Sequence, residues 1–281
     1  MSPIYWYDNQ FLPAEAVRVS PQDRGYYFGD GVYEVYRVYG GRLFETGLHY
    51  ERLARSAAGV KLALPFGEAE LEGVLTELVL RNEVREGTVY LQITRGVAPR
   101  NHLFPADAQP MAMAYCNEVA RPVTTMEAGI KTITLEDTRW LHCDYKTLNL
   151  LANVLAKQEA AERGAGDAIL RRGDIVTESS ASNVMIVKDG RILTHPANNL
   201  ILHGVTRAVS LRLARAEDIR AEERPFTVDE LLAADEAFVT GTTVEVTPIV
   251  SVDGRPIGSG EPGPVTRRLQ RAFARAIGLE S

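Results

Sequence analysis

The stretch from Thr138 to Lys157 reads Thr-Arg-Trp-Leu-His-Cys-Asp-Tyr-Lys-Thr-Leu-Asn-Leu-Leu-Ala-Asn-Val-Leu-Ala-Lys. Lys146 lies near its centre, and apolar residues follow with helical spacing, as at Leu148, Leu151 and Leu155. We therefore expect Lys146 at a junction between a loop and a helix. A lysine held there can be desolvated and act as an amine nucleophile, although an ordinary surface lysine before a helix gives the same local pattern.

The composition is that of an ordinary globular protein, since 45% of the 281 residues are hydrophobic and 24% are charged. The net charge of -6 argues against nucleic acid or an anionic membrane as the main partner. The amino-terminal residues show no basic region before an apolar core, and no apolar run reaches the ~18 residues that span a bilayer. We therefore expect a cytoplasmic protein without a membrane segment.

Cysteine and histidine give no sign of a disulfide framework or a metal site. The two cysteines, Cys116 and Cys143, lie outside any paired motif, and the histidines show no ligand spacing. Cys143 beside Asp144 could be a nucleophile, but a buried inert thiol is the commoner state of such a residue.

Strand and helix patterns are mixed without strict alternation, so we expect an α+β (mixed α/β) fold. We place a boundary near residue 120, between a small α/β domain (1–120) and a larger one (121–281). We expect strands at 4–7, 11–13, 17–19, 32–39, 42–44, 88–94, 111–117, 130–135, 167–171, 175–177, 184–188, 191–194, 219–223, 237–240 and 246–252. We expect helices after a Thr46 cap to residue 60, at 67–82, from Leu148 to about 163, at 204–216, after Thr227 and at 263–277.

The segment from Asp23 to Gly31 holds three glycines among aromatic residues and aspartates. This pattern predicts a tight loop whose backbone can approach another group closely. It is neither a Walker A loop nor a dinucleotide-binding fingerprint, because no strand precedes it and a strand follows it.

If Lys146 binds an aldehyde cofactor such as pyridoxal phosphate, a carboxylate must keep the ring nitrogen protonated and a cradle must hold the phosphate. Glu178 at a strand end could be that carboxylate. Arg52 and the small-residue turns Gly204-Val205-Thr206 and Gly241-Thr242-Thr243 could form the cradle. Each of these alone is more often a solvated turn residue, a helix cap or a surface arginine.

The substrate would also need a group that binds its carboxylate. Arg100 and His102, in an irregular loop between two strands, could provide it. Tyr33 could bring a phenol near the amine, although a tyrosine packed in a sheet and a loop histidine with a local hydrogen bond remain the simpler alternatives.

Together these residues resemble the fold type IV pyridoxal-phosphate enzymes and, among them, the D-amino acid aminotransferases. The resemblance covers nearly the whole chain. It rests on Asp23–Val35, His49–Leu53, Arg95–Gly96 with Pro99–Arg100 and His102–Pro105, Arg139–Leu141 with Cys143–Asp144 and Lys146, Thr177–Glu178 with Ser182–Val184, Thr194–Asn199, Gly204 with Thr206–Arg207, and Thr242–Thr243.

The resemblance implies that Lys146 forms the Schiff base and moves the proton, and that Glu178 pairs with the pyridine nitrogen. It implies that the phosphate is held by Arg52, Val205, Thr206 and Thr242, with Leu202 beside the ring. Tyr33, Arg100 and His102 would bind the substrate carboxylate.

The resemblance also implies a homodimer, with the cofactor between the two domains and the Arg100–His102 loop arriving from the neighbouring subunit. The substrates would be D-amino acids and 2-oxo acids, as in the conversion of D-alanine and 2-oxoglutarate to pyruvate and D-glutamate. The alternatives within the fold are a branched-chain L-amino acid or (R)-amine transaminase and an aminodeoxychorismate lyase. A non-catalytic binding protein is disfavoured because Lys146, Glu178 and Tyr33 are all present.

Two positions depart from the family pattern. Ala181 and Gly241 stand where serines are expected, so each loses a hydroxyl near the cofactor. Such hydrogen bonds are worth about 0.5–1.5 kcal/mol net, so cofactor affinity or substrate preference would shift while the chemistry survives.

Overall fold

A computed structural model describes residues 2–107 and 109–279 of the chain. The chain divides into two compact units. The first comprises Met1–Ala120 with Tyr145–Leu150, and the second comprises Arg121–Asp144 with Leu151–Ser281. The chain therefore crosses between the units more than once, because Tyr145–Leu150, which contains Lys146, belongs to the first unit.

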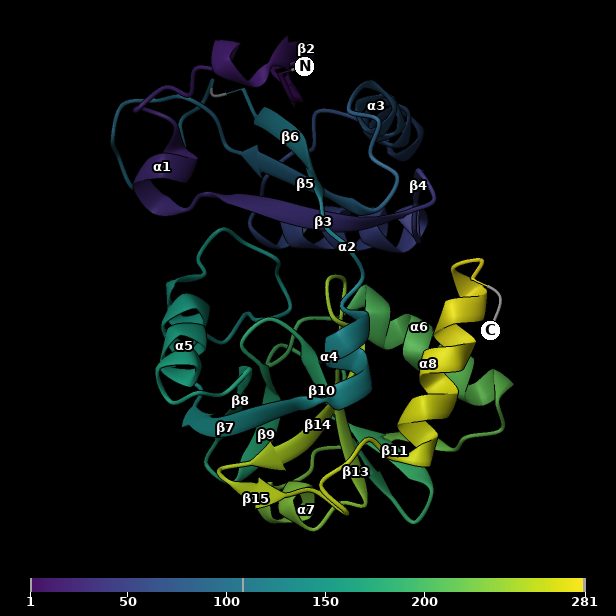
Figure 1. Cartoon of the computed structure of the whole chain (residues 1–281). Coiled ribbons are helices and arrows are strands. Elements are labelled where there is room, and N and C mark those ends of the chain that lie inside the picture. Colours follow the sequence, from purple (N-terminus) through teal and green to yellow (C-terminus); the bar gives the residue numbers. More distant parts are fainter. Residues whose placement is uncertain (1, 108, 280–281) are drawn as a thin grey trace. The chain divides into compact units, whose positions relative to one another are not determined.

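The first unit is built on an antiparallel sheet with the strand order β2-β1-β6-β5-β3-β4 (Figure 1). Its strands are β1 (Ile4–Tyr7), β2 (Gln10–Pro13), β3 (Gly31–Tyr39), β4 (Arg42–Leu43), β5 (Gly87–Thr94) and β6 (Met111–Glu118). Its helices are α1 (Arg24–Phe28), α2 (Thr46–Gly59) and α3 (Glu68–Arg81), and residues Ala14–Ala16 form a 3-10 turn.

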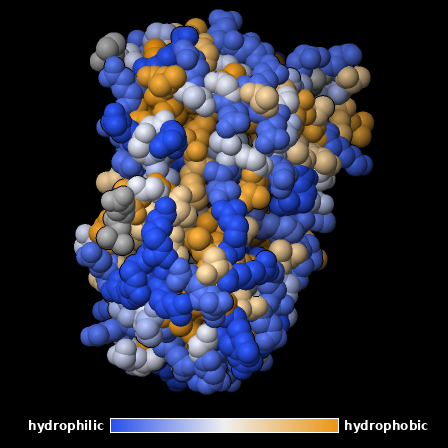
Figure 2. Space-filling view, turned by 90° about the vertical axis from the view of Figure 1, so that its right-hand side faces the viewer, coloured by the Kyte–Doolittle hydropathy of each residue, from blue (hydrophilic) through white to orange (hydrophobic). Residues whose placement is uncertain are grey.

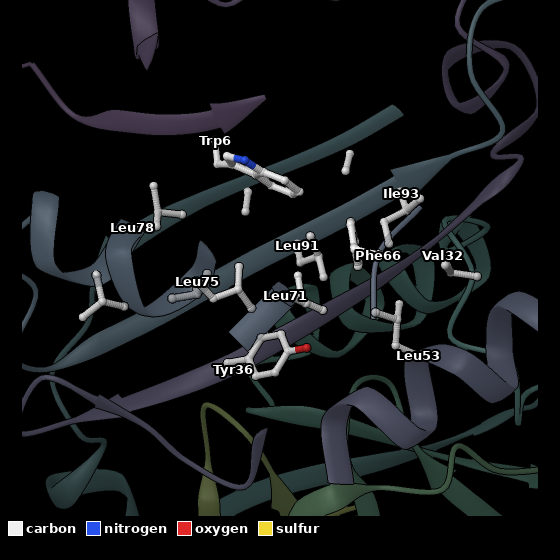
Figure 3. Packing of buried hydrophobic residues seen from close by; sticks show 14 of the residues in the cluster. Trp6, Val32, Tyr36, Leu53, Phe66, Leu71, Leu75, Leu78, Leu91 and Ile93 are labelled. Carbon is white, nitrogen blue, oxygen red and sulfur yellow. The ribbon is translucent and has the colours of Figure 1, made fainter. Parts of the chain in front are cut away.

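One face of this sheet packs against α2 and α3 and forms the hydrophobic core of the first unit. Figure 3 shows Trp6, Tyr36 and Leu91 of the strands among Leu53 of α2 and Leu75 of α3, all of them buried. Because side chains alternate along a strand, burial of Val32, Glu34, Tyr36 and Val38 on this face leaves Tyr33 and Val35 on the other.

The second unit is built on a mixed sheet with the strand order β12-β11-β10-β13-β14-β7-β8-β9, in which β15 pairs with β14. Its strands are β7 (Ile130–Glu136), β8 (Asp167–Arg172), β9 (Ile175–Ser179), β10 (Asn183–Lys188), β11 (Arg191–Thr194), β12 (Ala221–Glu223), β13 (Glu236–Gly241), β14 (Glu245–Val252) and β15 (Arg255–Pro256). The pairs β7–β8, β7–β14 and β11–β12 are parallel. This mixture of parallel and antiparallel strands confirms the mixed α/β class.

The helices of the second unit are α4 (Val123–Ala128), α5 (Leu151–Glu162), α6 (Val205–Ala216), α7 (Val228–Leu232) and α8 (Pro264–Ala276). The predicted cap of α7 is confirmed, because Thr227 and Glu230 exchange hydrogen bonds in a capping box.

Hydrophilic residues cover much of the face shown in Figure 2, with apolar residues in smaller patches between them. No helix in the described part of the chain has the length and apolar run needed to cross a bilayer.

Several local predictions were wrong. Residues 17–19 form no strand, because the chain leaves β2 through the 3-10 turn, and Val123–Ala128 forms a helix where none was predicted. Thr46 does not cap α2. Glu45 occupies the cap position in a left-handed conformation (φ 55°), and the Thr46 hydroxyl instead donates to Glu72 over 3.0 Å.

The predicted glycine loop from Asp23 to Gly31 contains a short helix, α1. The Asp23 carboxylate caps it by accepting from the Gly25 amide over 2.7 Å. A side chain at Gly25 would put a Cβ atom 2.4 Å from Thr94 Cγ2. The close approach is therefore to the end of β5.

Candidate active site

Lys146 is held by backbone pairing rather than by a helix. Tyr33 N donates to Lys146 O over 3.0 Å, Lys146 N donates to Ser56 Oγ over 3.0 Å, and Thr147 forms a bridge with Val32 of β3. The helix α5 begins only at Leu151. The prediction of a loop-to-helix junction at Lys146 was therefore wrong, because this segment extends along β3 instead.

The structure brings Lys146 and Tyr33 together. The Lys146 Nζ atom lies 4.1 Å from the centroid of the Tyr33 ring, in cation–π geometry. Both side chains are half-buried. The amine therefore rests on an aromatic face that fixes its position.

Tyr33 also begins a row of aromatic rings across its sheet face. The ring centroids of Tyr33 and Tyr90 lie 5.7 Å apart, those of Tyr90 and Tyr115 lie 5.2 Å apart, and those of Tyr115 and Tyr5 lie 5.0 Å apart. All four tyrosines are half-buried. The alternation within β5 and β6 carried this signal, although the sequence reasoning did not use it.

Arg52 of α2 lies in a buried ionic cluster. Its Nε atom donates to Glu34 Oε1 over 2.8 Å, its Nη2 atom donates to Oε2 over 2.7 Å, and His49 Nδ1 lies 2.7 Å from the same Oε2. Burial alone would raise the pKa of Glu34, but Arg52 and His49 outweigh it and hold that pKa well below its usual range. Burial lowers the pKa of His49. Glu34 is thus a buried partner of Arg52 that the sequence reasoning did not single out.

Arg100 and His102 converge on a third residue, Phe28 at the end of α1. The Arg100 Cζ atom lies 5.1 Å from the Phe28 ring centroid, and the His102 ring centroid lies 5.4 Å from it. Both polar side chains are exposed. Two nitrogen-bearing groups therefore share one aromatic platform, which is an arrangement suited to binding a carboxylate.

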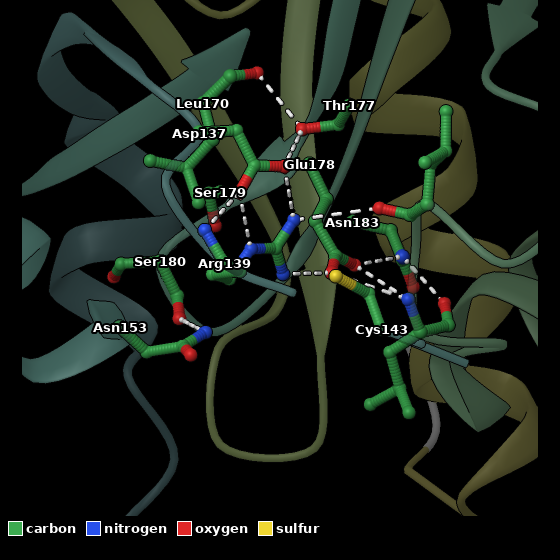
Figure 4. A network of polar contacts seen from close by, with 12 residues as sticks. Asp137, Arg139, Cys143, Asn153, Leu170, Thr177, Glu178, Ser179, Ser180 and Asn183 are labelled. Carbon is green, nitrogen blue, oxygen red and sulfur yellow. Dashed lines mark hydrogen bonds and ion pairs between the residues drawn. The ribbon is translucent and has the colours of Figure 1, made fainter. Parts of the chain in front are cut away.

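Glu178 is a buried carboxylate within β9, one residue before the end of the strand. Figure 4 shows two of its partners: Asn183 Nδ2 donates to it over 2.9 Å, and Arg139 forms an ion pair with it. The Leu202 amide also lies 3.1 Å from each carboxylate oxygen. Burial raises the pKa of Glu178, while Arg139 opposes that shift. Glu178, predicted to pair with the ring nitrogen, and Leu202, predicted to pack beside the ring, are in direct contact.

Arg139 connects Glu178 to a second buried carboxylate, Asp137 (Figure 4). Arg139 Nε and Nη2 each donate to Asp137 over 2.9 Å. Asp137 also accepts from Thr177 over 3.0 Å and from Arg172 over 3.1 Å. The two arginines therefore balance the negative charges of Glu178 and Asp137. The sequence predicted no role for Arg139, which was named only as part of a motif.

The amino terminus of α6 is a candidate site for an anion. Gly204 is its cap residue, no side chain of the described residues caps it, and Val205 and Thr206 are buried. A Cβ atom at Gly204 would lie 2.0 Å from Asn183 Oδ1, so only glycine fits there. Free amides at a helix start favour a phosphate group.

The two departures from the expected serines have a structural context. A Cβ atom at Gly241 would lie 2.8 Å from Ser182 Oγ and 3.1 Å from Val244 Cγ2, so a serine would crowd Ser182. Ala181 is exposed on the turn between β9 and β10. Thr242 follows Gly241 immediately after β13 and is half-buried.

The predicted site residues fall into two groups. Tyr33, Arg52, Arg100, His102 and Lys146 belong to the first unit. The second unit contains Glu178, Leu202, Val205, Thr206 and Thr242. The first group provides an amine and the exposed pair of Arg100 and His102, and the second provides a buried carboxylate and a helix start.

Comparison with known proteins identifies the class that this fold and these residues define. Residues 31–252 match the family of class IV aminotransferases, so the chain belongs to that family.

The chain is 48% identical to a D-alanine aminotransferase of Staphylococcus haemolyticus and 47% identical to one of Bacillus licheniformis, in each case over 96% of both chains. Among solved structures it resembles the branched-chain amino acid aminotransferase of Escherichia coli, with a TM-score of 0.93, 25% identity and coverage of 100% and 97% of the two chains. It also resembles the branched-chain amino acid aminotransferase of the thermophilic archaeon Thermoproteus uzoniensis, solved with norvaline, with a TM-score of 0.89, 28% identity and coverage of 100% and 97%.

Proposed function

We propose that this protein is a pyridoxal-phosphate-dependent D-amino acid transaminase, which moves an amino group from a D-amino acid such as D-alanine to a 2-oxo acid such as 2-oxoglutarate. The observation that carries the proposal is the 48% identity to a D-alanine aminotransferase over 96% of both chains. Identity to the two branched-chain enzymes is lower, at 25% and 28%, and an amine transaminase, whose substrate has no carboxylate, would not need the exposed pair of Arg100 and His102.

The second unit offers what the cofactor requires. Gly204 lets the Asn183 side chain lie close to the start of α6, where the amides of Val205 and Thr206 would hold the phosphate with Thr242 as a further ligand. Arg52 of the first unit would be another ligand. Glu178 would accept a hydrogen bond from the ring nitrogen and keep that nitrogen protonated. Leu202 would pack beside the ring.

Bound pyridoxal phosphate supplies an electron sink for negative charge at the substrate α-carbon. Lys146 would provide the amine that attaches the cofactor, and its Nζ atom would accept the α-proton of the substrate and pass it to the cofactor carbon. The Tyr33 ring keeps that atom in place. Arg100 and His102 bind the substrate carboxylate, which fixes the orientation of the α-carbon–hydrogen bond.

We propose further that the protein works as a homodimer in which the loop of Arg100 and His102 serves the site of the neighbouring subunit. Exposed apolar side chains in that loop support this, since Leu103 is 76% exposed and Phe104 is 54% exposed. The expectation of a cytoplasmic protein stays a prediction.

The test is to incubate the purified holoenzyme with 2-oxoglutarate and either D-alanine or L-leucine, and to separate the glutamate enantiomers by chiral chromatography. We expect D-glutamate with D-alanine and little product with L-leucine. Lys146→Ala should abolish the reaction, whereas Lys157→Ala, at an exposed position on α5, should retain it. Product from L-leucine alone would contradict the proposal.

A further inference from the structure

Arg24 is a buried arginine at the start of α1 that lies outside the predicted site. Its side chain is 3% exposed, and its Nε atom donates to Asp30 Oδ2 over 2.7 Å. Its backbone amide donates to Gly96 O over 2.9 Å. Burying a guanidinium costs free energy unless its N–H groups are hydrogen-bonded. The partners of its other N–H groups therefore show which segments Arg24 holds in place.

The remaining Arg24 contacts fix the loop that carries the carboxylate-binding pair. Arg24 Nη1 donates to Asn101 O over 2.6 Å and lies 3.3 Å from Leu103 O. These two carbonyls belong to the residues on either side of His102. The loop has no helix or strand of its own between Pro99 and Phe104, so one guanidinium supplies much of its backbone order.

The same guanidinium also supports the aromatic platform. The Arg24 Cζ atom lies 4.9 Å from the Phe28 ring centroid, and that ring is the one against which Arg100 and His102 pack. Arg24 therefore contacts both the backbone on either side of His102 and the surface on which the two recognition side chains rest.

Asp30 extends this support to the end of the loop. Its Oδ2 atom also accepts from Arg95 Nε over 2.9 Å, and the Arg95 Cζ atom lies 3.7 Å from the Phe104 ring centroid. Arg95 is anchored in turn by the carbonyl oxygens of Val60 and Lys61, each over 2.8 Å. The loop is thus held near His102 by Arg24 and at Phe104 by Arg95, with one shared carboxylate between them.

From these contacts we infer that Arg24 is a positioning residue for substrate recognition. It sets the geometry in which Arg100 and His102 meet a substrate carboxylate, and so makes the enzyme select amino donors that carry one. The inference rests on the proposed function and adds a residue that governs its substrate class.

The test compares the Arg24→Met and Arg24→Lys holoenzymes with the wild type on two kinds of amino donor, D-alanine and the carboxylate-free amine (R)-1-phenylethylamine. In Arg24→Met we expect KM for D-alanine to rise by about tenfold or more, with kcat, the cofactor absorption band and any rate with the amine little changed. Arg24→Lys keeps the charge and can reach one carbonyl, so it should recover part of the loss.

The matched control is Arg81→Met. Arg81 of α3 also pairs with a carboxylate, Glu77, over 2.7 Å and also lies on a phenylalanine ring, 4.2 Å from the Phe11 centroid, but on an exposed surface. It should leave both donors unaffected. Asp30→Asn gives a second variant should Arg24→Met not fold, with a smaller rise in the same KM.

Two outcomes would overturn the inference: an unchanged KM for D-alanine in the variants that fold, or equal losses with D-alanine and with the amine, which a general structural role would produce. Failure of the proposed function is a separate result, because the wild type would then not transaminate D-alanine at all.

Discussion

The guanidinium of Arg52 meets the carboxylate of Glu34 through two parallel hydrogen bonds, Nε to Oε1 over 2.8 Å and Nη2 to Oε2 over 2.7 Å, where both side chains are buried. The pair joins α2 to β3, the strand that also bonds to Lys146. Two of the donors that Arg52 could offer a phosphate are therefore engaged with Glu34, which orients the guanidinium before any ligand binds.

Glu34→Gln should destabilise the protein strongly. Replacing the carboxylate leaves a buried guanidinium without its counter-charge, and breaking such a pair costs about 3–5 kcal/mol of unfolding free energy. Urea denaturation of the cofactor-free protein measures the loss. Glu77→Gln is the control, because Glu77 forms an exposed pair with Arg81 and should cost less than about 0.5 kcal/mol. Equal effects of the two substitutions would contradict this account of the cluster.

The unfolding free energy should fall as the pH drops from 7 toward 5, partly because of His49. Burial lowers the pKa of His49 in the folded protein, whereas the unfolded residue titrates near 6.5. Below that pH the unfolded chain gains a proton that the folded chain does not, so stability is lost as pH falls. His49→Gln should flatten this part of the profile, by at most about 1.4 kcal/mol per pH unit. If the unfolding free energy of His49→Gln falls with pH as steeply as that of the wild type, groups other than His49 cause the loss of stability.

The difference between local and non-local structure explains which features the sequence could predict. Thr227 and Glu230 form the expected capping box because a few residues of one segment determine it. The local structure around Lys146 was wrongly predicted because the backbone partners of Lys146, Tyr33 and Ser56, are far away in sequence. No local pattern encodes that pairing. For the same reason Phe28 was not foreseen as the platform for Arg100 and His102.

Arg139→Met should weaken cofactor binding as well as destabilise the fold, because Arg139 pairs with two buried carboxylates. Without Arg139, burial of Glu178 is opposed by fewer partners, so its pKa should rise further and its charged form should become less available to the cofactor ring. We expect the dissociation constant of pyridoxal phosphate to rise roughly 10- to 100-fold, as measured by absorbance titration of the cofactor-free protein. Arg171→Met, which breaks an exposed pair with Glu136 on the neighbouring strand, should leave it unchanged.

Gly204→Ala tests the cradle at the start of α6. The added Cβ atom would lie 2.0 Å from Asn183 Oδ1, so the Asn183 amide must move, and that amide donates both to Glu178 and to Leu202 O. Inorganic phosphate should raise the melting temperature of the cofactor-free wild type, and its apparent affinity should fall about tenfold or more in the variant. Gly67→Ala is the control, since Gly67 also caps a helix but has open space around it and should cost less than about 1 kcal/mol without affecting phosphate. An unchanged phosphate response in Gly204→Ala would mean that the anion is held elsewhere, because the crowded cradle could not accept it at full affinity.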